Sequence, residues 1–90
     1  MAKAEIGWTG RTEDGTRREV YARRVGDRWL FFDREKRYDP WKRLETPPLS
    51  DWLELLDAVE RRMRRRLLPP EEFPRLRKTI QELFPDAEVP

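Results

Sequence analysis

The sequence RREVYARRVGDRWLFFD, residues 17–33, carries the clearest signal for the fold of this chain. Two runs rich in β-branched and aromatic residues, 17–25 and 28–33, flank the dipeptide Gly26-Asp27. Such a dipeptide between two runs of this kind is typical of a tight turn that joins antiparallel strands. The stretch therefore predicts a β-hairpin.

The alternation of side chains along the strands predicts two different sheet faces. The face expected to meet the helices carries Ile6, Trp8, Val20, Ala22, Leu30 and Phe32. The opposite face is expected to carry Tyr21, Arg23, Trp29 and Phe31. Because the third strand is apolar on both faces, it is either covered on both sides or presents aromatic rings to a partner.

The segment before the hairpin is expected to extend the sheet, and the segment after it is expected to connect the sheet to the rest of the chain. Residues 4–11 alternate like a strand, and Asp14-Gly15 is a strong signal for the turn that follows. The charged segment 34–49 contains Tyr38, Trp41 and Leu44 at intervals of three. This segment forms either a short fourth strand or a lid over the sheet.

Two helices are predicted in the second half of the chain. The first spans residues 50–68, with Ser50 as N-cap and Asp51 in its first turn. Its apolar stripe consists of Trp52, Leu56, Val59, Met63 and Leu67. The second helix spans 70–84, with the stripe Phe73, Leu76, Ile80, Leu83 and Phe84, and residues 85–90 form a flexible tail.

These elements predict an α+β fold in one domain, residues 1–90. A three-stranded antiparallel β-meander spans 4–33, and two α-helices follow it and pack on one sheet face. The segment 34–49, with its open choice between a fourth strand and a lid, connects the two parts.

The composition excludes several classes of function. The chain has no Cys and no His, so it lacks a thiol nucleophile, the commonest general base and the commonest metal ligands. We therefore expect no catalysis, no cofactor and no small-molecule substrate. No run is long and apolar enough for a membrane span or a signal peptide, so we expect a cytoplasmic protein that does not bind membranes. The net charge of +2 arises from charges of both signs mixed along the chain.

The run RRMRRRLLPP, residues 61–70, is the most basic part of the sequence. Helical spacing places Asp57 one turn before Arg61, and Glu60 one turn before Arg64, which is the favourable order for ion pairs. The helix dipole also favours cations in the last turns. The helix accounts for the run without a ligand, and Arg62, Arg65 and Arg66 stay as candidates for phosphate contacts.

The second sheet face is the candidate binding surface. We expect a protein partner, or a second copy of this chain, to contact Tyr21, Trp29, Phe31 and Trp41, with Arg23 at the polar rim, because aromatic residues and Arg supply interface hot spots. The alternative is nucleic-acid binding by the same face together with Arg62, Arg65 and Arg66. An equally strong competing interpretation is that the segment 34–48 covers this face with Tyr38 and Trp41.

Overall fold

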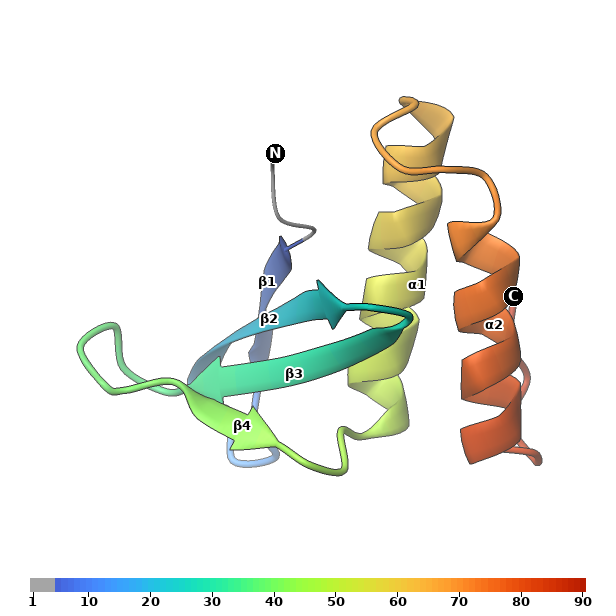
Figure 1. Cartoon of the computed structure of the whole chain (residues 1–90). Helices are drawn as coiled ribbons and strands as arrows, with labels where there is room; N and C mark the ends of the chain where they lie inside the picture. Colours follow the sequence, from blue (N-terminus) through green and yellow to red (C-terminus); the bar gives the residue numbers. More distant parts are fainter. Residues whose placement is uncertain (1–4) are drawn as a thin grey trace. The chain divides into compact units, whose positions relative to one another are not determined.

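The structure, a computed structural model, describes residues 5–90 and confirms the α+β class. Its elements, in chain order, are β1 (Glu5–Arg11), β2 (Arg17–Val25), β3 (Arg28–Arg34), β4 (Lys42–Leu44), α1 (Leu49–Arg64) and α2 (Glu72–Leu83) (Figure 1). The first strand was predicted from residue 4, which lies outside the described residues. Backbone contacts divide the chain into two compact units, Met1–Pro47, here called the sheet unit, and Pro48–Pro90, the helical unit.

The sheet unit holds one antiparallel sheet of four strands in the order β1-β2-β3-β4. The short strand β4 pairs with β3 through Phe31 opposite Leu44 and Asp33 opposite Lys42. Of the two interpretations of the segment 34–48, the structure therefore shows a fourth strand at the edge of the sheet.

The turn between β2 and β3 sets the register of the hairpin. Gly26 has a φ of +65°, and Val25 pairs with Arg28 across the two turn residues. Glycine with positive φ at the first turn position is the mark of a type II′ turn, whose twist matches that of the strands. From this closing pair, the register places Tyr21 opposite Phe32 and Ala22 opposite Phe31.

This register corrects the predicted faces of β3. Residues directly opposite each other in an antiparallel sheet share a face. Trp29 and Phe31 therefore lie on the face of Val20 and Ala22, and Leu30 and Phe32 lie on the face of Tyr21, which is the reverse of the expectation. The expectation was wrong because β3 is apolar on both faces, so that its own alternation does not distinguish the inner from the outer face.

The face that carries Phe31 is the buried face of the sheet. Ile6, Val20, Ala22 and Phe31 are each at most 2% exposed. The ring of Trp8 meets Phe31 edge-on, with 6.1 Å between ring centroids. At the end of this face, Arg18 donates to Asp33 at 3.0 Å. Phe31 is thus a core residue of the sheet unit.

The β1–β2 connection is a hydrogen-bonded loop around Asp14. Its carboxylate accepts hydrogen bonds from the Thr12 hydroxyl and, at 3.1 Å, from the Thr16 amide. The Thr12 hydroxyl and the Thr16 amide lower the pKa of Asp14 below its ordinary value. Gly15 has a φ of +87°, which confirms the predicted turn at Asp14-Gly15.

In the helical unit, α1 begins one residue earlier than predicted. Pro48 occupies the N-cap position and its carbonyl accepts the Asp51 amide at 3.0 Å, so Ser50 lies in the first turn instead of capping it. Asp51 lies in the first turn, as predicted. The buried residues of α1 are Asp51, Trp52, Leu55, Leu56, Ala58 and Val59. The helices α1 and α2 lie side by side (Figure 1).

The C-terminal end of α1 corrects the predicted boundary at residue 68. The helix ends at Arg64, and Arg66 has a φ of +61°, the only positive φ of a non-glycine residue within residues 5–90. The Arg66 amide donates to Met63 at 3.0 Å, and the Leu67 amide donates to Arg62 at 2.8 Å. This pair of bonds is a Schellman motif, which satisfies the last carbonyls of the helix.

The second helix is shorter than predicted at its N-terminal end, since it begins at Glu72 instead of residue 70. Leu76 and Ile80 are its buried apolar residues. Arg77 donates to the backbone oxygens of Pro90, at 2.7 Å, and of Val89, at 3.5 Å. The flexibility expected for residues 85–90 stays a prediction. Across residues 5–90, no helix reaches the length and apolarity that crossing a membrane would require.

Candidate binding surface

The sheet face opposite the buried one is here called the aromatic–arginine face. The register assembles it from alternate residues of neighbouring strands. One row across the sheet runs from Gly7 through Tyr21 and Phe32 to Arg43. The charged strand residues of this face are six arginines and two glutamates: Arg11, Arg17, Arg23, Arg28, Arg34, Arg43, Glu5 and Glu19.

Three aromatic rings form a cluster on this face. Tyr21 and Phe32 are stacked, with ring centroids 4.8 Å apart and planes 18° apart. Trp41, which immediately precedes β4, meets Tyr21 edge-on at 4.7 Å and 89°. Both arrangements are the ones that aromatic quadrupoles favour. The rings therefore hold one another in place, and Trp41 stays 37% exposed.

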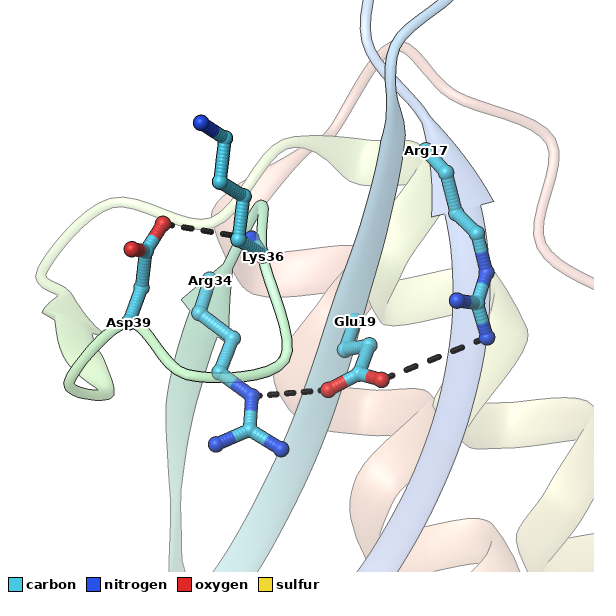
Figure 2. Close-up of polar contacts among 5 residues, drawn as sticks. All are labelled: Arg17, Glu19, Arg34, Lys36 and Asp39. Atoms are coloured by element: carbon cyan, nitrogen blue, oxygen red, sulfur yellow. Dashed lines mark hydrogen bonds and ion pairs between the residues drawn. The ribbon is translucent and has the colours of Figure 1, made fainter.

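Arg34 connects the rings to the charges of the face. Its guanidinium carbon lies 4.1 Å from the centroid of the Trp41 ring, a cation–π contact. Its Nε donates to Glu19 Oε1 at 2.7 Å. A nitrogen of the Arg17 guanidinium lies 4.0 Å from the other carboxylate oxygen, Glu19 Oε2. Glu19 therefore lies between two arginines (Figure 2). One carboxylate thus orients the cation that covers Trp41.

The pKa of Glu19 reflects this arrangement. The hydrogen bond from Arg34 lowers the pKa of Glu19 below its ordinary value, and the charges of Arg34, Arg17 and Arg37 lower it further. Partial burial raises it, but the hydrogen bond has the larger effect. Glu19 therefore stays ionised at neutral pH and keeps its hold on Arg34.

An open pocket lies beside the ring cluster. It is lined by Glu5, Gly7, Tyr21 and Trp41. Gly7 faces Tyr21 across the β1–β2 ladder and has no side chain, which leaves the space beside the two rings unfilled. A Cβ at Gly7 would meet the Tyr21 Cβ at 3.8 Å, an ordinary van der Waals contact. The pocket is thus open because residue 7 lacks a side chain.

The loop between β3 and β4 does not cover the face in the predicted way. The Lys36 amide donates to Asp39 at 3.2 Å and the Asp39 amide donates to the Lys36 carbonyl at 2.9 Å, so that the loop closes on itself (Figure 2). Tyr38 is 94% exposed and covers nothing. Only Trp41 of the two predicted covering residues packs on the ring cluster.

Four arginines of the face, Arg11, Arg23, Arg28 and Arg43, form no ion pair within residues 5–90. Arg11 instead donates to the Gly15 carbonyl at 2.9 Å. Arg43 lies opposite Phe32, and Arg23 lies two residues along β2 from Tyr21. The ring cluster is therefore bordered on two sides by guanidinium groups that form no ion pair, although Glu5 lies opposite Arg23 across the β1–β2 ladder.

The structure brings together only some of the predicted site residues. Tyr21, Arg23 and Trp41 share the aromatic–arginine face, whereas Trp29 and Phe31 lie on the opposite face. Sequence reasoning missed Phe32 and Arg34. The signal that would have found them is the length of the Gly26-Asp27 turn, because a two-residue turn fixes which residues are opposite each other.

The predicted helical arginines belong to the other unit. The ion pairs Arg61–Asp57, at 3.3 Å, and Arg64–Glu60, at 3.6 Å, are confirmed. Arg62 lies in the last turns of α1, whereas Arg65 caps the helix and Arg66 lies beyond it. The predicted helical positions of the last two are therefore wrong. Arg62, Arg65 and Arg66 lie at the end of α1, outside the sheet unit.

The described residues contain no group of three or more His, Cys, Asp or Glu side chains that could hold a metal ion. Comparison of the chain with models of protein families, with curated protein sequences and with solved structures finds no match.

Proposed function

We propose that this chain is a non-catalytic binding module that contacts another protein through the aromatic–arginine face. The observation that carries the proposal is the cluster of Tyr21, Phe32 and Trp41, which is partly exposed and bordered by arginines. The lack of His and Cys, which supply most general bases and thiol nucleophiles, supports a binding role over a catalytic one.

The cluster has the composition and order of an interface anchor. Aromatic residues and Arg supply most hot spots of protein interfaces, usually near the centre of the contact. The rings pack on one another and on Arg34, so a partner would meet side chains that are already ordered. Binding to ordered side chains costs less conformational entropy than binding to mobile ones. The open pocket beside Tyr21 and Trp41 offers room for a partner side chain.

Nucleic-acid binding is the second candidate, and the excess of arginines over glutamates on the face favours it. Stacking of bases requires ring faces that are free. Here Tyr21 and Phe32 occupy each other's faces, and Arg34 covers Trp41. Glu19 and Glu5 on the same face would also repel phosphates. These features favour a protein partner over a nucleic acid.

The proposal is tested by affinity capture with three forms of the full chain, followed by identification and crosslinking of the captured protein. We expect a protein partner to be captured by the wild type and by Tyr38→Ala, and to be lost with Trp41→Ala. Tyr38 is the matched control, because it is an exposed aromatic residue of the same loop that touches no ring of the cluster. Thermal unfolding of each variant checks that the fold is kept.

Two results would contradict the proposal. Capture that is unchanged by Trp41→Ala would remove the ring cluster from the contact. Capture that disappears after nuclease treatment would transfer the role to the second candidate. Sedimentation over a range of concentrations shows whether the captured partner is a second copy of the chain.

A further inference from the structure

We infer that the partner segment which binds the aromatic–arginine face is an extended acidic peptide segment, with carboxylates on both sides of an apolar residue. The inference rests on the proposed function and adds the chemistry of the partner to it. The charges of the face, their distance from the rings and the ring surfaces that remain available support it.

The charge of the face is not neutralised from within. Glu19 is occupied by Arg34 and Arg17, and it compensates those two arginines. Glu5, the other glutamate, borders the open pocket and lies opposite Arg23 across the β1–β2 ladder without forming an ion pair with it. Arg23, Arg28 and Arg43 form no ion pair within residues 5–90. The charge that a partner would meet around the rings is therefore positive, and an acidic segment complements it.

The positions of two of these arginines define the spacing of the partner's acids. Arg43 lies one strand away from Phe32, which corresponds to about 4.8 Å in a sheet. Arg23 lies two residues from Tyr21 along β2, which corresponds to about 6.8 Å. An apolar side chain placed against the rings would thus have both guanidinium groups within reach of carboxylates two residues away along an extended segment, since residues two apart share a side. A carboxylate that pairs with Arg through two parallel hydrogen bonds binds in a defined orientation, so that the pair adds specificity as well as affinity.

The chemistry of the face favours a peptide over a nucleic acid as the source of negative charge. Each ring already has a neighbour, so the cluster offers edges and one open pocket instead of flat surfaces for successive bases. A peptide can place one carboxylate beside Arg43 and another on the side of Arg23 away from Glu5, and can keep both away from Glu19. A phosphate backbone carries a charge at every nucleotide and cannot avoid that carboxylate.

The test measures binding of synthetic probes to the full chain by NMR titration at low and at moderate salt. The probes are a short peptide with the repeat Glu-Ser-Leu-Ser, which places Glu and Leu on the same side of an extended segment, the same peptide with Gln in place of Glu, and an oligothymidylate of equal charge. We expect the Glu peptide to bind about tenfold more tightly than the Gln peptide at low salt, to weaken as salt is added, and to shift the resonances of Tyr21 and Trp41.

Matched variants locate the effect. The double variant Arg23→Gln/Arg43→Gln should reduce affinity for the Glu peptide about tenfold, to the level of the Gln peptide. The double variant Arg62→Gln/Arg65→Gln removes the same charge from the helical unit and should leave the affinity unchanged. Each double variant replaces two arginines with Gln, so the two variants remove the same charge and differ only in the part of the chain from which it is removed. An effect of the second pair equal to that of the first would overturn the inference.

The other outcomes are equally decisive. Equal affinity for the Glu and Gln peptides, no binding of either, or tighter binding of the oligothymidylate would each overturn the inference. Capture of a protein partner that depends on Trp41 would then leave the proposed function standing with a neutral partner. Capture that does not depend on Trp41 would contradict the proposed function itself.

Discussion

Gly26 in the sheet unit and Arg66 in the helical unit share a positive φ, +65° and +61°, although Gly26 belongs to a type II′ turn and Arg66 to the left-handed end of a helix. Gly26 opens a two-residue turn and sets the register of the following strand. Arg66 ends α1 through a Schellman motif. Glycine adopts a positive φ at little cost, whereas a residue with a Cβ adopts it at a cost of roughly 1–2 kcal/mol. Both positions decide where the neighbouring side chains point.

The comparison shows that periodicity places a side chain only within its own element. In the sheet unit, the turn at Gly26 exchanges the expected roles of Phe31 and Phe32. In the helical unit, the left-handed residue removes Arg65 and Arg66 from the predicted helix. Helical periodicity and strand alternation therefore do not determine which residues from different elements share a face.

The largest expected effect tests the exchange in the sheet unit. Phe31→Ala should lower the free energy of unfolding by about 3–5 kcal/mol, because a ring that is only 1% exposed is replaced by a cavity. Phe32→Ala should cost only about 1–2 kcal/mol, because Phe32 is half-buried on the other face. Urea unfolding of both variants measures the difference. A larger loss for Phe32 would reverse the assignment of the two faces.

The second effect tests the turn itself. Gly26→Ala should lower the free energy of unfolding by about 1–2 kcal/mol, because alanine resists the positive φ that the turn requires. Gly10→Ala serves as the control, since a Cβ there meets nothing within 4 Å and its φ is not positive. Equal losses in the two variants would mean that the backbone of Gly26 does not constrain the residue type.

The third expected effect is an increase in the free energy of unfolding, and it tests the helical unit. Arg66→Gly should raise the free energy of unfolding by about 0.5–1 kcal/mol, because it relieves the left-handed backbone at C′, although the greater freedom of glycine in the unfolded chain offsets part of the gain. Arg65→Gly, at a residue with a φ of −89°, should not stabilise the chain. Thermal unfolding compares the two. A destabilised Arg66→Gly variant would contradict the Schellman end of α1.

The smallest expected effect is a change in how the free energy of unfolding depends on pH under acidic conditions. The lowered pKa of Glu19 stabilises the folded chain at pH values above the ordinary glutamate pKa of 4.5, and this contribution is lost as the pH falls through the lowered folded value. In Glu19→Gln the decline of stability below pH 4.5 should therefore be weaker than in the wild type. Urea midpoints measured across this range give the comparison. Superimposable profiles would show that Arg34 does not hold Glu19 in solution.

The same substitution also sharpens the binding inference. Glu19→Gln removes a carboxylate from the aromatic–arginine face and releases Arg34 and Arg17 from it. Affinity for the Glu peptide should therefore increase. A decrease would indicate that the hold of Glu19 on Arg34 matters more to the partner than the added positive charge.

Sequence patterns were enough to predict the order of the first three strands and the two helices, the turns at Asp14-Gly15 and Gly26-Asp27, and the ion pairs Arg61–Asp57 and Arg64–Glu60. These features depend on spacing within one element or across one turn, where the period of the backbone is known. Of the predicted apolar stripes, Leu67 and Leu83 are exposed instead of buried. The sequence also identified Tyr21, Arg23 and Trp41 as members of one candidate surface. Only the tertiary structure decided that Phe32 and Arg34, instead of Trp29 and Phe31, complete that surface. Membership of a face depends on the pairing between strands, and the apolar pattern of β3 is compatible with either pairing.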